Sequence, residues 1–151
     1  LSTRINLCLS SLDRIAFHGF LNRSREELLV ERNVRELDIK VARTDAPVAF
    51  LSGGNQQKVV VGKWLNTNPR LVLLDEPTRG IDVQAKQQMF QIIWDMSKRG
   101  ISCIVVSSEL EELLDICHRI LIMRAGRIVS DVRPSELSLE NLFAACMKEE
   151  V

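Results

Sequence analysis

Two short apolar runs, separated by a long amphipathic segment, dominate the pattern of this chain. Residues 71–74 read Leu-Val-Leu-Leu between turn signals, which predicts a strand buried on both faces. Residues 101–106 predict a second buried strand, and residues 83–99 predict a helix that ends at Gly100. Strands that alternate with helices favour a mostly parallel sheet with helices on both faces. The predicted fold class is therefore α/β.

The charged first third of the chain predicts small helices that lead into a connector. Residues 3–12 mix the helical and strand periods, and we expect a helix there. Ser24-Arg25-Glu26-Glu27 has the form of a capping box, which predicts a helix that runs to about residue 37. The apolar side of this helix is expected to carry Leu28, Val34 and Leu37. Residues 39–50 contain Pro47 and little periodicity, so they predict a connector.

The last third of the chain predicts three more elements. Residues 109–116 indicate a short acidic helix. Residues 119–123 and 127–131 flank Ala125-Gly126 and predict a β-hairpin. A final helix is expected from Ser138 to about Lys148.

Composition narrows the classes of protein to which this chain can belong. The 151 residues are 46% hydrophobic and carry 20 basic and 20 acidic side chains, so nothing indicates disorder or binding to nucleic acid. No apolar run reaches the ~20 residues that a membrane-spanning helix needs. The four cysteines are scattered without the spacing of metal ligands, which fits reduced thiols in a cytoplasm. The chain starts at Leu1 rather than Met, so we expect it to be a piece of a longer protein.

The segment Leu-Ser-Gly-Gly-Asn-Gln-Gln-Lys at residues 51–58, here called the signature segment, carries the first candidate chemistry. Ser52 is expected to cap a helix of residues 53–66 with its hydroxyl. Gly53 and Gly54 have no side chains, so a charged ligand can approach the backbone. The free N–H groups of a helix start favour an anion. The alternative is a glycine-rich turn before an ordinary amphipathic helix.

Two adjacent carboxylates, Asp75 and Glu76, follow the first apolar strand. Open parallel sheets place their ligand sites at this end of their strands. The alternative is an acidic loop after a core strand. The signature segment followed by Leu-Asp-Glu-Pro-Thr-Arg-Gly-Ile-Asp at residues 74–82 resembles the signature and Walker B motifs of ABC-transporter ATPases. In detail, this pair of motifs resembles the ATP-binding subunits of bacterial sugar importers.

The resemblance implies roles in binding and hydrolysing ATP for residues of this chain's own cassette. Asp75 matches the aspartate that orients Mg²⁺ through water, and Glu76 matches the carboxylate that positions the attacking water. Ser108 lies at the switch position, where most members of the family have histidine. A switch serine is typical of the second cassette in two-cassette sugar importers, and we assign the chain to that place.

The resemblance also implies residues that act on ATP held by the opposite cassette. Asp82 matches the D-loop aspartate, which works at the interface between the two cassettes. The signature residues expected to contact the nucleotide in trans are Ser52, Gly53, Gly54, Asn55 and Gln56. Asn55 and Lys58 replace the glutamine and arginine of the commoner form of the motif.

Other parts of the family pattern are missing from the printed sequence. It contains no GxxxxGK[ST] phosphate loop, so we expect a partial P-loop NTPase domain that is inactive alone. Residues 1–50 are interpreted as a remnant of the helical subdomain with its connector. Residues 51–151 are interpreted as the signature helix, the Walker B and switch strands, the hairpin and the last helix of the core.

The expected partners and location follow from the resemblance alone. They are a second cassette, fused or dimeric, membrane-spanning permease subunits, and indirectly a periplasmic sugar-binding protein. The subunit would lie peripherally on the cytoplasmic face of the bacterial inner membrane and use ATP and Mg²⁺ for monosaccharide uptake.

Two alternatives to an importer ATPase stay open. One is an ABC ATPase of DNA repair or translation, although Asn55, Arg79-Gly80-Ile81 and the zero net charge argue against that class. The other is a non-catalytic interaction module that lends its signature segment to a partner.

Overall fold

Helices and short strands alternate along the chain, and they divide between two compact units. The computed structural model describes residues 1–147. Unit 1 consists of residues 1–72 and 78–102, and unit 2 of residues 73–77 together with the chain from residue 103 onward. The α/β class is confirmed. The predicted boundary at residue 50 stays a prediction.

Unit 1 begins with a cluster of small elements and ends with two longer helices. The expected helix at the start is split, because a 3₁₀ turn separates two short α-helices. The early elements are α1 (Thr3–Cys8), η1 (Leu9–Ser11), α2 (Leu12–Ile15), β1 (Ala16–Phe17), β2 (Phe20–Leu21) and α3 (Arg23–Glu36). The later elements are η2 (Val48–Phe50), α4 (Gly53–Leu65) and α5 (Val83–Lys98).

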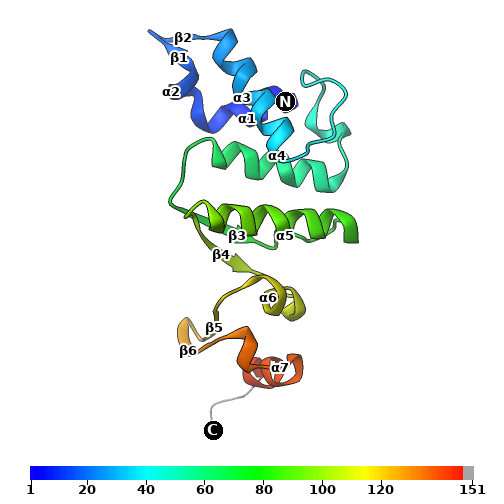
Figure 1. Cartoon of the computed structure of the whole chain (residues 1–151), viewed down its shortest axis with the longest axis vertical. Coiled ribbons are helices and arrows are strands. Elements are labelled where there is room, and N and C mark those ends of the chain that lie inside the picture. Colours follow the sequence, from blue (N-terminus) through cyan, green and yellow to red (C-terminus); the bar gives the residue numbers. More distant parts are fainter. Residues whose placement is uncertain (148–151) are drawn as a thin grey trace. The chain divides into compact units, whose positions relative to one another are not determined.

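Helix α4 is the central layer of unit 1, with α1 and α3 on one side and α5 on the other (Figure 1). Gly62 permits the close approach to α1 and α3. A Cβ at Gly62 would lie 2.7 Å from Asn33 Oδ1, 2.9 Å from Leu37 Cδ1 and 3.0 Å from Leu7 Cδ2. The buried apolar side chains of this unit include Leu7, Val30, Leu37, Val59, Met89, Phe90, Ile93 and Met96.

A buried amide network joins three helices of unit 1. The Asn66 side chain, at the end of α4, donates from Nδ2 to the carbonyl of Leu7 at 3.0 Å. Its Oδ1 accepts from Asn33 Nδ2 at 2.9 Å and from Arg32 Nη2 at 3.1 Å. Because Asn66 and Asn33 are both buried, these bonds satisfy groups that would otherwise be costly to remove from water.

Helix α3 differs from its prediction at its start and on its apolar face. Its N-cap is Asn22, whose side chain accepts from the Arg25 N–H, so the predicted capping box at Ser24 is wrong. Leu28, expected on the buried side, is 67% exposed. The buried face instead contains Val30 with two polar residues, Glu26 and Asn33, which hydropathy alone does not assign to a core.

Strands β3 (Leu71–Asp75) and β4 (Ser102–Val106) pair with each other in a two-stranded sheet. Ser102 N–H donates to Arg70 O at 3.0 Å, and Glu76 N–H donates to Val106 O at 2.9 Å, so the strands run parallel. The prediction that these two strands are buried is wrong, because Leu73 is 70% and Ile104 52% exposed. Apolar side chains alternate in exposure along both strands because one face of this ribbon is left uncovered by the described elements.

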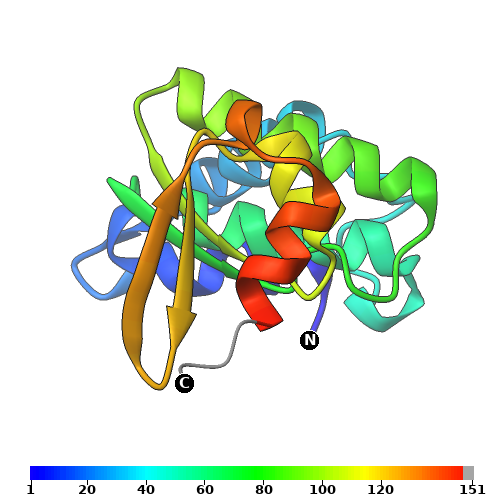
Figure 2. The ribbon, with the colours of Figure 1, turned by 90° about the horizontal axis from the view of Figure 1, so that it is seen from below.

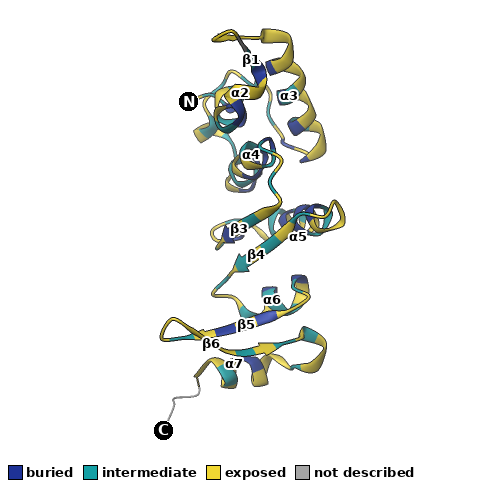
Figure 3. Ribbon diagram, turned by 90° about the vertical axis from the view of Figure 1, so that its left-hand side faces the viewer, coloured by how far each residue is buried: buried dark blue, intermediate teal, exposed yellow. Residues whose placement is uncertain are grey.

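The C-terminal part of unit 2 packs a hairpin against two helices, as Figure 2 shows for the hairpin and α7. Ala125 and Gly126 form the predicted turn with φ values of 47° and 78°. The buried core of this part of unit 2 consists of Ile120, Ile122 and Leu142, and Figure 3 shows the buried positions along β5. The elements are α6 (Leu110–Ile116), β5 (Ile120–Arg124), antiparallel β6 (Arg127–Val132), η3 (Pro134–Glu136) and α7 (Leu139–Met147).

Several element ends follow the sequence closely. Gly100 takes a left-handed conformation with φ 81° just after α5, as its C-terminal position predicts. The Ser138 hydroxyl accepts from the Asn141 N–H at the start of α7. Lys148, where that helix was expected to end, lies outside the described residues. No helix within residues 1–147 is long and apolar enough to cross a membrane, and in the same part of the chain Cys8, Cys117 and Cys146 are free thiols.

Candidate functional site

The signature segment begins α4 in unit 1, but its serine does not cap the helix as predicted. Ser52 is the N-cap residue by backbone geometry, and its carbonyl accepts the first helical bond from the Gln56 N–H at 2.9 Å. Its hydroxyl makes no bond to a backbone N–H of the first turn and instead accepts from the Asn55 side chain, Nδ2, at 2.8 Å. The Ser52 side chain therefore leaves the first-turn N–H groups of α4 uncapped.

The two signature glycines lie in different surroundings. Gly54 is buried, and a Cβ there would lie only 2.5 Å from the Ala85 Cβ. Gly53 is exposed, and a Cβ there would meet Gly80 O and Ile81 Cγ2 at an ordinary 3.5 Å. Gly54 thus permits close packing of α4 on the start of α5, whereas Gly53 keeps its backbone accessible.

The predicted D-loop lies against this helix start. Asp82 is the N-cap of α5, and its Oδ1 accepts from the Ala85 N–H at 2.9 Å. Since Gly54 contacts the same Ala85, unit 1 brings Asp82 and the signature residues into one region. Gln56 is occupied locally, because its Nε2 donates to Leu51 O at 2.8 Å.

Asn55 and Lys58 of the signature segment hold the chain that leaves α3, which sequence analysis missed. The Lys40 N–H donates to Asn55 Oδ1 at 2.8 Å. Lys58 Nζ donates to the carbonyl of Asp38 at 2.8 Å and lies 3.9 Å from Asp38 Oδ2. Lys58 is only 3% exposed, and this burial lowers its pKa despite the neighbouring carboxylate. The one sequence signal was that both residues depart from the commoner motif.

In unit 2 the structure brings Glu76 and Ser108 together. Asp75 is the last residue of β3 and is exposed. Glu76 follows with φ 48°, a conformation that is uncommon for a residue with a side chain. Its Oε1 accepts from the Ser108 backbone N–H at 2.8 Å. The contact therefore uses the main chain of residue 108, not its hydroxyl.

A buried glutamate that sequence analysis did not select supports the switch loop, residues 107–109. The Ser107 hydroxyl donates to Glu112 Oε2 at 3.1 Å and accepts from the Glu109 N–H at 3.0 Å. Glu112 lies in the first turn of α6 and is buried. In the sequence Glu112 is one of several acidic residues of a short helix, and nothing in the sequence distinguishes it from its exposed neighbours.

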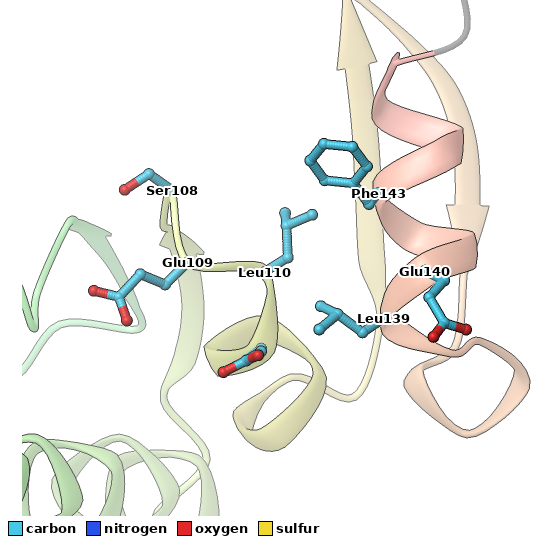
Figure 4. Close-up of a pocket in the computed structure, with 7 residues that line it drawn as sticks. Ser108, Glu109, Leu110, Leu139, Glu140 and Phe143 are labelled. Carbon is cyan, nitrogen blue, oxygen red and sulfur yellow. The ribbon is translucent and has the colours of Figure 1, made fainter.

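A pocket of about 540 Å³ opens beside the switch loop in unit 2 (Figure 4). Leu110, Leu139 and Phe143 face the space between the start of α6 and α7. Three glutamates, Glu109, Glu111 and Glu140, add negative charge to its lining together with Ser108. The pocket is thus apolar in its middle and acidic at its edge.

The comparisons with known proteins agree on one family. The family model described as ABC transporter matches residues 7–79. A ribose import ATP-binding protein of Chelativorans sp. (strain BNC1) is 42% identical over 97% of this chain. The corresponding protein of Geobacillus kaustophilus (strain HTA426) is 41% identical over 96% of the chain. This chain belongs to the ABC transporter family.

The solved structures extend the family likeness to the fold. An ABC transporter in an inward-facing conformation matches 95% of this chain and 57% of its own, with a TM-score of 0.79 and 18% identity. A dimeric ATP-binding cassette bound to ADP and phosphate matches 89% of this chain and 57% of its own, with a TM-score of 0.73 and 18% identity. The predicted family and the partial ABC ATPase fold are confirmed. The chain spans 29% of the length of the ribose import relatives.

The oxygen donors of unit 2 fit the Mg²⁺ that accompanies ATP in ABC ATPases. Within residues 1–147, no cluster of three or more His, Cys, Asp or Glu side chains is arranged to hold a metal by itself. Mg²⁺ bound together with phosphates usually takes one or two carboxylates and keeps several waters. The exposed Asp75 at the end of β3 meets that requirement. The roles predicted for Asp75, Glu76, Ser108, Asp82 and the signature residues stay predictions.

Proposed function

We propose that this chain is part of the ATP-hydrolysing subunit of an ABC-type importer of monosaccharides, and that it comes from the second of two cassettes. The names of the relatives, which are ribose import ATP-binding proteins, support the transport class. The observation that carries the ATPase assignment is the bond from the Ser108 N–H to Glu76 Oε1 at the end of the β3–β4 pair.

In this proposal Glu76 orients the water that attacks the terminal phosphate of ATP. A carboxylate that accepts a backbone N–H bond is held in one direction, and its second oxygen stays available to accept from a water. Asp75 would hold Mg²⁺, through water, one residue earlier. Mg²⁺, when bound, would supply positive charge that offsets the negative charge of the phosphates.

The signature residues would act on the ATP of the opposite cassette. The uncapped helix start at Ser52 and the exposed Gly53 backbone are suited to an anion. Asp82, which caps α5 beside them, would lie at the interface between the cassettes. The further partners in this proposal are membrane-spanning permease subunits and, indirectly, a periplasmic sugar-binding protein, with the subunit peripheral on the cytoplasmic face of the membrane.

The site built on Glu76 is expected to turn over slowly. Ser108 cannot carry the positive charge or the reach of a histidine side chain toward the phosphate. Hydrolysis should therefore fall mainly to the opposite site, which uses Ser52, Gly53 and Gly54 of this chain.

Steady-state ATPase assays test this division of labour in an importer reconstituted with the subunit that carries this sequence. Ser52→Glu would place a carboxylate beside the phosphate. Losing a charge-assisted bond costs ~1.5–3 kcal/mol, and repulsion adds to that. Since ~1.4 kcal/mol is a factor of ten, turnover should fall at least about tenfold. Glu76→Gln should reduce turnover less than Ser52→Glu does. Loss of turnover in Glu76→Gln together with normal turnover in Ser52→Glu contradicts the assignment to the second cassette.

The isolated chain should neither bind ATP·Mg tightly nor hydrolyse it, because a phosphate loop supplies most contacts to the phosphates in such enzymes. Calorimetry on the folded 151-residue chain measures this. A dissociation constant near micromolar would show that other residues replace the loop. The same measurement separates an ATPase part that needs the rest of its cassette from a chain with a complete nucleotide site.

A further inference from the structure

Both ends of the Asn55 side chain are engaged, and the bonds give it a fixed direction. Oδ1 accepts from the Lys40 backbone N–H at 2.8 Å, and Nδ2 donates to Ser52 Oγ at 2.8 Å. A backbone N–H can only donate, so the atom that faces Lys40 must be the oxygen. Rotating the amide by 180° would set a donor against a donor. Lys40 therefore determines that Asn55 presents a donor to Ser52.

This direction decides what the Ser52 hydroxyl can do. A hydroxyl has one hydrogen and two lone pairs, and here one lone pair is taken by Asn55. The Ser52 hydroxyl makes no cap bond within α4, so its hydrogen is free to donate to a further acceptor. The donors follow one another from Lys40 N–H to the Asn55 amide to the Ser52 O–H, and such chains polarise each bond in the same sense.

We propose that Asn55 is a positioning residue that keeps the Ser52 hydroxyl a hydrogen-bond donor toward the phosphate of the ATP bound by the opposite cassette. This inference rests on the proposed function. It revises the expected role of Asn55, because its amide reaches the nucleotide through Ser52 rather than by direct contact.

Lys58 supports the same arrangement from one helical turn farther along α4. It binds the Asp38 carbonyl at 2.8 Å, two residues before the N–H that orients Asn55. Asp38 has φ 48°, so the chain turns sharply there as it leaves α3. The buried Lys58 thereby fixes the segment from Asp38 to Lys40 against α4. The orientation of Ser52 is thus linked to the C-terminal end of α3.

A double-mutant cycle in the reconstituted importer tests the inference. Asn55→Leu removes both hydrogen bonds with little change in side-chain size and no change in charge. In this variant the Ser52 hydroxyl is no longer held as a donor toward the phosphate. Loss of that one hydrogen bond should lower kcat/KM for ATP about threefold to tenfold. Ser52→Ala should lower kcat/KM at least as much. In the Ser52→Ala background, Asn55→Leu should have less than a twofold further effect.

Two further variants serve as rescue and control. Asn55→Gln retains an amide and should recover part of the lost kcat/KM. Asn141→Leu makes the same change at an exposed position of α7 and should leave kcat/KM within twofold of the unchanged importer.

The outcomes separate failure of this inference from failure of the proposed function. A full effect of Asn55→Leu in the Ser52→Ala background overturns the inference, because Asn55 then acts by direct contact or through stability alone. An unchanged kcat/KM in Asn55→Leu overturns it as well. If Ser52→Ala leaves kcat/KM unchanged, the proposed trans role of the signature segment is itself wrong.

Discussion

Replacing Gly54 by alanine tests how closely α4 must approach α5. The added Cβ would lie 2.5 Å from the Ala85 Cβ. Carbon atoms in contact normally lie about 3.5–4.0 Å apart, so the two helices must separate by roughly 1 Å or more. Both atoms are fixed to helical backbone, so neither can turn aside. Overpacking of this kind costs about 1–3 kcal/mol of unfolding free energy.

Gly53→Ala is a matched control at the neighbouring position. It is the same chemical change, but its Cβ would meet its nearest neighbours at 3.5 Å, an ordinary van der Waals distance. We expect the free energy of unfolding of Gly53→Ala to stay within about 0.5 kcal/mol of that of the unchanged chain, as for most substitutions of exposed residues. The difference between the two variants then measures the clash at Gly54 rather than the general effect of an added methyl group.

Urea denaturation followed by tryptophan fluorescence reports on the relevant part of the molecule. Both tryptophans, Trp64 on α4 and Trp94 on α5, belong to unit 1. Ala85→Gly removes the opposing methyl group and should cost about 1 kcal/mol by itself as a glycine in a helix. Combined with Gly54→Ala, it should cost clearly less than the sum of the two single changes, because the clash is gone. A Gly54→Ala chain as stable as Gly53→Ala would refute the reasoning.

Two further predictions concern buried groups of unit 1 and use the same fluorescence assay. Asn66→Leu removes the buried partner of the Leu7 carbonyl and of the Asn33 amide, which should lower the free energy of unfolding by about 1–3 kcal/mol for each group. Gln87→Leu on the exposed side of α5 is the control and should change stability by less than about 0.5 kcal/mol. Equal stability of the two variants would contradict the role of the network. Burial raises the pKa of the Cys8 thiol from 9.0 to about 11, so the folded state favours the neutral thiol. The stability that this preference contributes is complete below pH 9 and is lost as the pH rises toward 11. Over that range we expect unit 1 to lose up to about 2–3 kcal/mol, and Cys8→Ala should flatten the pH dependence; an unchanged slope in that variant would show that other groups cause it.

Helix ends and turns that depend on a single residue and its neighbours could be predicted well from the sequence. Gly100 ends α5 and Ala125-Gly126 turns the hairpin, because a left-handed backbone at these points depends on the residue itself and its immediate neighbours. The alternation of strand and helix predicted a mostly parallel sheet, and β3 and β4 do run parallel. What such patterns leave open is how much of each strand its neighbours cover. The burial of Leu73 was therefore overestimated.

Helix caps were less predictable because several nearby side chains compete for the same role. Ser24 matched the capping box, yet Asn22 begins the helix two residues earlier and its side chain bonds the Arg25 N–H. Ser52 has the residue type and position of a cap, but its hydroxyl accepts from the Asn55 side chain instead of from a backbone N–H. Residue type shows that a cap is possible, whereas the actual bond depends on which partner lies within reach.

The contacts of Asn55 and Lys58 illustrate why the candidate site could be only partly derived from the sequence. Their positions three apart on a helix place them on one face, which the sequence does show. Their partners, the Lys40 N–H and the Asp38 carbonyl, come 15 and 20 residues earlier and meet α4 only through the packing of α3. Both partners are backbone groups, so no complementary side-chain pattern marks them. A signature segment can therefore vary at these two positions and still fold, provided that each new side chain reaches the same backbone groups.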